Sequence, residues 1–204
     1  MPSKFISISG FIGSGKDTAA EYLINNHNFT KLSFAGSLKD AVSLVFGWDR
    51  VLLEGETLES RQWREQIDPW WAARLNMPHL TPRWVLQYWG TEVCRQGFHP
   101  DIWVASLEHK ILKCEGNIVI TDARFANELN VVKKLNGKLI RIERGERPYW
   151  YNDAVSFNEK IIDYPPLGVH ASEYSSVGLE YDYYLDNNGT KEELFKALNL
   201  IVNL

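Results

Sequence analysis

The residues best suited to chemistry lie near the N-terminus, in the run Gly10-Phe11-Ile12-Gly13-Ser14-Gly15-Lys16-Asp17-Thr18. This run fits the phosphate-loop pattern G-x-x-x-x-G-K-[ST] except at its last position, where an aspartate precedes the threonine. A buried strand is predicted over 5–9 and a helix over 18–24. Loop N–H groups and the helix N-terminus would therefore face a polyphosphate, with the lysine near its outer phosphates. The residues expected to bind a nucleotide here are Gly10, Gly13, Ser14, Gly15, Lys16, Asp17 and Thr18.

The aspartate in this run brings negative charge toward the phosphates. Such a carboxylate is tolerable if Asp17 contacts Mg²⁺, directly or through water. Alternatively, Asp17 caps the helix and Thr18 approaches the metal. The sequence predicts a metal contact for one of the two and does not choose between them.

A second candidate pair follows the predicted strand over 117–121. In a parallel sheet, ligands bind beyond the carboxyl ends of the strands, so Asp122 and Arg124 are placed to act. Asp122 could hold a Mg²⁺-bound water or position a nucleophile, and Arg124 could clamp an acceptor phosphate. The alternative is a strand-end ion pair or a helix cap.

Three further residues are candidates for binding an acceptor. Lys39 lies in the first turn of a predicted helix over 38–46, where the helix dipole disfavours a cation unless an anion is shared. Arg83 and Gln87 share one face of a predicted helix over 83–96. Arginine suits bidentate phosphate binding and glutamine can pair with a base edge. Solvated surface positions are the alternative for all three.

Tryptophan is concentrated in the middle of the chain, which holds six of its eight tryptophans between 63 and 103. The ordinary explanation is a small helical core filled by aromatic rings. The sharper hypothesis is that one or two, with Trp71 as our candidate, stack on a planar base.

Arginines recur at every third position from 141 to 147. Phosphoryl transfer needs positive charge over the transferring group, and arginines on a closing segment supply it. We expect Arg144 and Arg147 to act in this way, while Arg141, inside a predicted strand, is the least favoured. His170 near Glu173 is a weaker candidate, for an acid–base pair.

These residues are positioned by alternating strands and helices. Strands are predicted at 5–9, 30–34, 117–121, 138–142 and 183–185, and helices also over 103–112, 126–135 and 191–198. Such alternation predicts an α/β fold with a mostly parallel central sheet covered by helices on both faces. Segment 48–82, rich in tryptophan and proline, is expected to form helices and loops outside the sheet, and 143–166 a mobile excursion.

Composition limits the function classes. The chain has 204 residues, 45% apolar and 24% charged, with a net charge of −4. This balance favours a small anionic ligand over a nucleic-acid polymer. Two cysteines without metal-ligand spacing predict reduced thiols and a cytoplasmic location, and neither a membrane span nor a signal peptide is evident. Composition leaves a homodimer open.

Taken together, the motifs resemble those of bacteriophage-type deoxynucleoside monophosphate kinases, a branch of the P-loop nucleoside monophosphate kinases. The resemblance covers most of the chain. It rests on the 10–18 run with its GKDT ending and on five later motifs, which are Ala35-Gly36-x-x-Lys39-Asp40, Pro82-Arg83 with Gln87-x-x-Gly90-Thr91-Glu92, Asp101-x-Trp103-Val104, Asp122-x-Arg124-x-x-Asn127-Glu128, and Asn188-Gly189-Thr190 with Glu192-Glu193-Leu194.

The resemblance implies transfer of the ATP γ-phosphate to a deoxynucleoside 5′-monophosphate, with Mg²⁺, in one three-layer P-loop kinase domain over 1–204. It implies an acceptor-binding insertion at 48–82, a lid at 143–168, and a location in the host cytoplasm if a phage encodes the chain. It places Lys39, Arg83, Gln87, Asp122 and Arg124 on the acceptor side, and Asn188 and Gly189 near the adenine. The alternatives are a kinase of another phosphorylated metabolite, such as dephospho-coenzyme A, and a nucleotide-binding regulator without catalysis.

Overall fold

The structure, a computed structural model, describes residues 2–169 and 171–203. The chain divides into two compact units. Unit 1 comprises 1–33 and 108–204, and unit 2 comprises 34–107. Each unit is coherent in itself, and we describe them separately.

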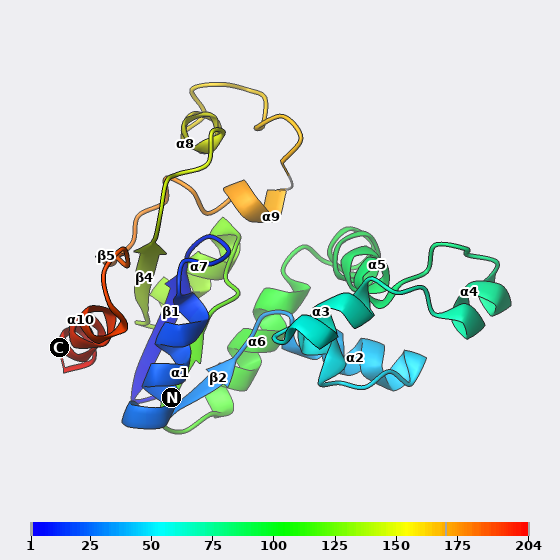
Figure 1. Ribbon diagram of the computed structural model, residues 1–204, viewed down its shortest axis with the longest axis horizontal. Coiled ribbons are helices and arrows are strands. Elements are labelled where there is room, and N and C mark those ends of the chain that lie inside the picture. Colours follow the sequence, from blue (N-terminus) through cyan, green and yellow to red (C-terminus); the bar gives the residue numbers. More distant parts are fainter. Residues whose placement is uncertain (1, 170, 204) are drawn as a thin grey trace. The chain divides into compact units, whose positions relative to one another are not determined.

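Unit 1 is built on a parallel five-stranded sheet in the order β2-β3-β1-β4-β5 (Figure 1). Its strands are β1 (Lys4–Ser9), β2 (Phe29–Leu32), β3 (Asn117–Ile120), β4 (Lys138–Glu143) and β5 (Tyr183–Asp186). Its helices are α1 (Lys16–His27), α7 (Ala126–Lys134), α8 (Tyr151–Asn158), α9 (Ala171–Tyr174) and α10 (Lys191–Asn203). The predicted parallel α/β sheet is confirmed, with each predicted strand within two residues of its observed bounds.

Two helices cover one face of this sheet. Ile6 and Ile8 of β1 and Ile140 and Ile142 of β4 form a buried core with apolar residues of α1 and α10. Side chains alternate along a strand, so the residues between them point to the other face. There Phe5 approaches Val132 of α7, beside Gly137. The sheet therefore lies between two helical layers, and this layering confirms the predicted three-layer arrangement.

The register of the sheet brings three strand ends to one edge. Ser9, the last residue of β1, pairs with Arg141 of β4, and Ser7 pairs with Ile120 of β3. The glycine loop (residues 10–16) follows β1 directly, and α1 follows the loop. Residues after β1, β3 and β4 are therefore collected around the loop, as the rule for parallel sheets requires.

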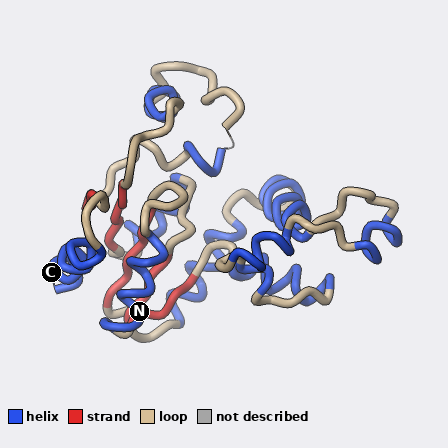
Figure 2. Tube along the Cα trace, in the orientation of Figure 1, coloured by secondary structure: helices blue, strands red, loops and turns tan. Residues whose placement is uncertain are grey.

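Unit 2 is helical, as the tube in Figure 2 shows for the segment from α2 to α6. Its elements are α2 (Gly36–Phe46), η1 (Leu52–Glu54), α3 (Leu58–Arg64), α4 (Pro69–Leu75), α5 (Pro82–Tyr88), the π-helix η2 (Trp89–Gln96) and the first half of α6 (Ile102–Lys113). Prolines begin α4 and α5, where their missing N–H is tolerated, after the side-chain caps Asp68 and Thr81. The single helix predicted over 83–96 is thus an α-helix continued by a π-helix.

Tryptophans fill the core of unit 2. Trp48 and Trp103 are buried among Leu38, Val42 and Leu53, and five other tryptophans of this unit pack at the margin or lie exposed. Several indole N–H groups have partners: Trp48 Nε1 donates to Asp68, Trp71 Nε1 to the Phe46 carbonyl and Trp103 Nε1 to the Gly90 carbonyl. The ordinary explanation, a small core filled by rings, accounts for most of them.

Two helices in unit 1, α8 and α9, were not predicted. Helix α8 lies within the segment expected to be a mobile excursion, and its Ala154 packs with Tyr174 and Val177 in a small apolar cluster. Phe11 of the glycine loop joins this cluster, edge-on to Trp150. Within the described residues, no helix is long and apolar enough to cross a membrane.

Candidate nucleotide-binding site

The glycine loop has a backbone that requires its glycines. Gly13 and Gly15 have φ angles of 80° and 99°, in the left-handed region where a side chain is strained. A Cβ on Gly10 would lie 2.5 Å from the Ile142 carbonyl oxygen. The Ser14 N–H donates to the Phe11 carbonyl, which closes the turn at 3.1 Å. The loop therefore opens at the N-terminus of α1 in the form that suits a phosphate.

A residue that sequence reasoning missed holds this loop. Asn187, 8% exposed, donates from Nδ2 to the Ser14 carbonyl at 2.8 Å. The same Nδ2 lies 2.3 Å from the position that a Cβ on Gly15 would take. Its neighbour Asn188 was the predicted residue, and it is exposed, accepting from the Gly145 N–H at 2.8 Å. The signal was only an Asn-Asn-Gly turn after β5, which does not say which amide faces inward.

A small cavity lies beside the glycine loop. Three cationic side chains line it: Lys16 of the loop, Arg124 after β3 and Arg141 of β4. Thr121, Ala123, Ser176 and the loop residues 10–12 complete most of the lining. Glu173 of α9 also lines the cavity and accepts from Arg124 Nη1 at 2.7 Å. Cations on a phosphate loop can stabilise a polyphosphate.

Arg124 is positioned by the cap of helix α7. Glu128 is buried, and its Oε2 accepts from the backbone N–H of Arg124 at 2.7 Å and of Phe125 at 3.2 Å. A carboxylate there also suits the positive end of the helix dipole. The spacing of Asp122, Arg124 and Glu128 in the sequence therefore has a structural cause, since the last fixes the backbone of the second.

The predicted metal-binding residues lie at the start of α1 and the end of β3. Asp17 is exposed, with carboxylate oxygens 3.9 Å from Lys16 Nζ and 3.9 Å from Lys31 Nζ. Thr18 and Asp122 are half-buried, and Asp122 lies between the cavity-lining Thr121 and Ala123. Among the described residues, no three His, Cys, Asp or Glu side chains cluster as a metal site. The donors available are the hydroxyl and carboxylate oxygens that Mg²⁺ accepts alongside phosphate oxygens.

The two arginines expected to close over the phosphates lie outside this lining. Arg144 and Arg147 are exposed. Arg147 Nη2 donates to Glu143 at 2.9 Å, and its guanidinium stacks on Tyr151, 4.4 Å from the ring centre. The ion pair raises the pKa of Arg147, so its charge is secure. Of the arginine series, the structure brings Arg141 to the cavity instead.

The acceptor-side candidates other than Asp122 and Arg124 belong to unit 2. Lys39 donates from Nζ to Glu54 at 2.5 Å, and Arg50 pairs with the same carboxylate. Burial of Glu54 raises its pKa, but the hydrogen bonds and charges of Lys39 and Arg50 outweigh burial and hold the pKa below 4.5. The anion that the position of Lys39 predicts is, in this structure, a side-chain carboxylate.

Arg83 and Gln87 are exposed on α5, as their shared face predicts. Arg83 Nη1 donates to Glu65 at 2.9 Å. Nearby Arg64, which the motifs did not indicate, is half-buried, and burial together with the charge of Arg83 lowers its pKa. Trp71 is half-buried and bonded to the backbone at Phe46. Unit 2 thus carries a group of arginines near the predicted acceptor residues.

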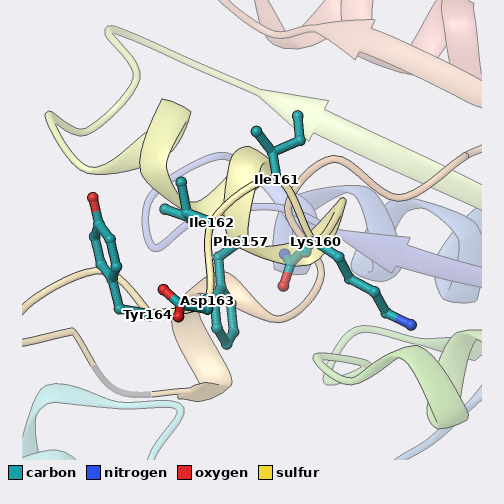
Figure 3. A pocket seen from close by; sticks show the side chains of 7 residues that line it. Phe157, Lys160, Ile161, Ile162, Asp163 and Tyr164 are labelled. Carbon is teal, nitrogen blue, oxygen red and sulfur yellow. The ribbon is translucent and has the colours of Figure 1, made fainter.

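A second cavity lies in the predicted lid segment, along the loop that follows α8. Its lining comes from one run of the chain, 157–164, of which all residues but Glu159 take part. In Figure 3 the Lys160 ammonium and the Tyr164 hydroxyl point to opposite sides. Because its polar groups do not converge, this hollow does not indicate a site. His170, the acid–base candidate beside Glu173, lies outside the described residues.

Comparison with known proteins identifies relatives along nearly the whole chain. The chain is 33% identical to a protein of Acanthamoeba polyphaga mimivirus named as a deoxynucleotide monophosphate kinase, over 95% of this chain and 93% of the relative. It is 28% identical to the deoxynucleoside-5′-monophosphate kinase of Escherichia phage T5, over 66% of this chain and 73% of that protein. No protein-family model matches the chain.

The solved structures that match this chain include the following two kinases. Shikimate kinase from Aquifex aeolicus has a TM-score of 0.47 and 14% identity, over 98% of this chain and 96% of that chain. Dephospho-CoA kinase from Campylobacter jejuni has a TM-score of 0.44 and 16% identity, over 98% and 95%. At these TM-scores the similarity carries no conclusion about this chain. The mimivirus relative, in contrast, shows the family and confirms the resemblance that the motifs indicated. The chain belongs to the deoxynucleotide monophosphate kinase family.

Proposed function

We propose that this protein transfers the γ-phosphoryl group of ATP to the 5′-phosphate of a deoxynucleoside monophosphate, giving the diphosphate. One observation carries the proposal. Lys16 of the glycine loop and Arg124, which follows β3, line one cavity at the N-terminus of α1. Binding a nucleotide needs the first, and transfer also needs a cation such as the second to position the acceptor phosphate. The relatives' names supply the substrate class.

In this mechanism the loop N–H groups and the N-terminus of α1 hold the phosphates of ATP. Lys16 neutralises charge on the outer phosphates, and Arg124 orients the acceptor phosphate for in-line attack. Asp122 would hold a Mg²⁺-bound water or position the acceptor. Fixed cations around the transferring group stabilise the charge of the transition state with little reorganisation, which is the main catalytic term in phosphoryl transfer.

The oxygen donors near the loop fit a magnesium ion. Asp17 or Thr18, with Asp122 through water, would hold it beside the phosphates. Mg²⁺ bound there would neutralise charge on the ATP phosphates. Lys16 and Lys31, which pair with Asp17, would then turn toward the phosphates.

The remaining assignments concern the acceptor, the lid and the base. Lys39, Arg83 and Gln87 have the charge and hydrogen-bonding groups that a nucleoside monophosphate needs, and Trp71 offers a ring for stacking. Lys39 and Arg83 already pair with Glu54 and Glu65, so substrate binding exchanges one carboxylate for another anion.

Two exposed groups are proposed to act on ATP itself. Arg144 and Arg147 would cover its phosphates from the 143–168 segment, with Arg147 leaving Glu143. Asn188 and Gly189 would lie near the adenine.

The deciding experiment is a coupled assay of ADP release with MgATP and each deoxynucleoside monophosphate. We expect turnover with at least one, and its loss by 100-fold or more in Lys16→Ala, because a fixed charge on the transferring group is worth about 10² to 10³ in rate. Lys196→Ala, an exposed lysine on α10, is the matched control and should keep wild-type turnover.

Three results would contradict the proposal. Turnover only with dephospho-coenzyme A or another phosphorylated metabolite would reassign the acceptor. Slow ATP hydrolysis that no acceptor stimulates would indicate a regulator. Full turnover by folded Lys16→Ala would remove the lysine from the reaction.

A further inference from the structure

Arg141 is a buried arginine in the middle of the functional edge of the sheet. It is 3% exposed and lies on β4, paired in register with Ser9 of β1, just before the glycine loop. Its strand neighbours Ile140 and Ile142 face the core beneath α1 and α10. Alternation therefore directs Arg141 to the opposite face, where it lines the cavity with Lys16 and Arg124.

The guanidinium of Arg141 is held in place by rings. It lies 4.6 Å from the centre of the Phe11 ring and 5.8 Å from that of Tyr181. Phe11 belongs to the glycine loop, so the arginine is tied to the loop itself. Cation–π contacts of this kind restrain the guanidinium without forming hydrogen bonds to its N–H donors.

One of those donors has no partner in the protein. Arg141 Nη2 is buried and makes no hydrogen bond among residues 2–169 and 171–203. The nearest carboxylate oxygen, Glu143 Oε1, forms a long ion pair with Nε at 3.9 Å and is also buried without a hydrogen bond, while Oε2 accepts from Arg147. Buried polar groups are normally hydrogen-bonded, so Nη2 is a donor that an anion in the cavity would satisfy.

We propose that Arg141 binds the outer phosphates of the nucleotide held on the glycine loop. This inference rests on the proposed function for the identity of the nucleotide. An anion that reaches Lys16 within the cavity also meets the Arg141 guanidinium, because the two side chains line the same small space. The charge over the transferring group is thus supplied from β4, by a residue already in position before any segment closes.

The structure also distinguishes Arg141 from Arg147. Arg147 is exposed, and it has both a carboxylate partner and an aromatic partner. An exposed arginine that is already hydrogen-bonded gains little from moving to a phosphate, while a buried one with an unsatisfied Nη2 gains a missing hydrogen bond. We therefore expect the larger loss of nucleotide affinity from the strand arginine.

The test is calorimetric titration of ATP, inorganic tripolyphosphate and adenosine, without acceptor, on the whole protein and on Arg141→Met and Arg141→Lys. One charge-assisted hydrogen bond corresponds to about a 10- to 100-fold change in affinity. We expect ATP and tripolyphosphate to bind about that much more weakly to Arg141→Met and to recover in part with lysine. Adenosine should bind within about twofold of wild type.

Thermal unfolding without ligand separates binding from structure. Methionine packs well on rings, and Glu143 keeps Arg147 as a partner, so replacing the incompletely hydrogen-bonded buried cation should leave the midpoint unchanged or raise it. A structural arginine predicts the reverse, with lower stability and unchanged ATP affinity. Tyr181→Leu removes one ring from the stack but not the charge, and should keep ATP affinity within about twofold.

Each outcome bears on the proposal. Wild-type affinity of Arg141→Met or Arg141→Lys for ATP and tripolyphosphate would overturn it, and so would equal losses for adenosine. If Arg141→Met does not fold, Arg141→Lys decides alone. Because binding is measured without acceptor, a failure of the kinase assay would refute the proposed function and leave this inference standing.

Discussion

The hydrogen bond from Asn187 to the Ser14 carbonyl offers a direct test of what holds the glycine loop. The bond is 2.8 Å long, and both residues are buried, at 8% and 2% exposure. Asn187→Ala leaves the buried Ser14 carbonyl without this donor, which costs about 1–3 kcal/mol. At about 2–4 °C per kcal/mol, the unfolding midpoint should fall by roughly 2–12 °C.

The same change should weaken nucleotide binding, because a loop without this support must be ordered by the ligand. If ATP has to supply about 1.4 kcal/mol of its binding free energy to order the loop, its affinity falls about tenfold. Asn187→Asp is the sharper variant: it is isosteric, but sets a carboxylate oxygen against the Ser14 carbonyl and a negative charge beside the phosphates. We expect ATP affinity to fall in the order wild type, Asn187→Ala, Asn187→Asp.

Calorimetric titration with ATP and scanning calorimetry measure both effects. Asn25→Ala, an exposed asparagine of α1, is the control and should change neither quantity appreciably. The reasoning is refuted if Asn187→Asp binds ATP within twofold of wild type, or if Asn187→Ala lowers the midpoint by less than about 1 °C.

Two further predictions concern ion pairs that the substrate must exchange or that pH can break. Glu173→Ala removes one carboxylate that pairs with Arg124, so the KM for the deoxynucleoside monophosphate should fall several-fold in steady-state assays, since this carboxylate no longer has to be displaced. An unchanged or higher KM would show that Glu173 does not compete. The pKa of Glu54 is held low by Lys39 and Arg50, so its contribution to stability is complete above pH 4.5 and is lost as pH falls through its folded-state value. Glu54→Gln should therefore unfold with less dependence on pH between 5 and 3 than wild type in acid titrations followed by circular dichroism, and parallel curves would contradict this.

Much of unit 1 could be predicted because its signals are local. Short apolar runs bounded by turn residues define the strands, and glycine is the residue that positive φ angles favour at positions 13 and 15. Helix α8 was missed because its stability comes from packing of Ala154 on Tyr174 and Val177 rather than from an amphipathic pattern. The π-helical continuation of α5 was also beyond reach, since a helical pattern in the sequence does not fix the hydrogen-bond spacing.

The sequence by itself determined that a nucleotide loop is present, which strand precedes it and which polar residues follow the next buried strand, because these depend on neighbours along the chain. Only the tertiary structure decided which cations surround the loop. Parallel register brings Arg141 beside Ser9 and alternation directs it to the cavity, while Arg147, six residues on, pairs with Glu143. The choice of Asn187 over Asn188 as the loop's support was made in the same way. Such contacts join segments up to 173 residues apart, and spacing along a chain carries no information about distances across a sheet.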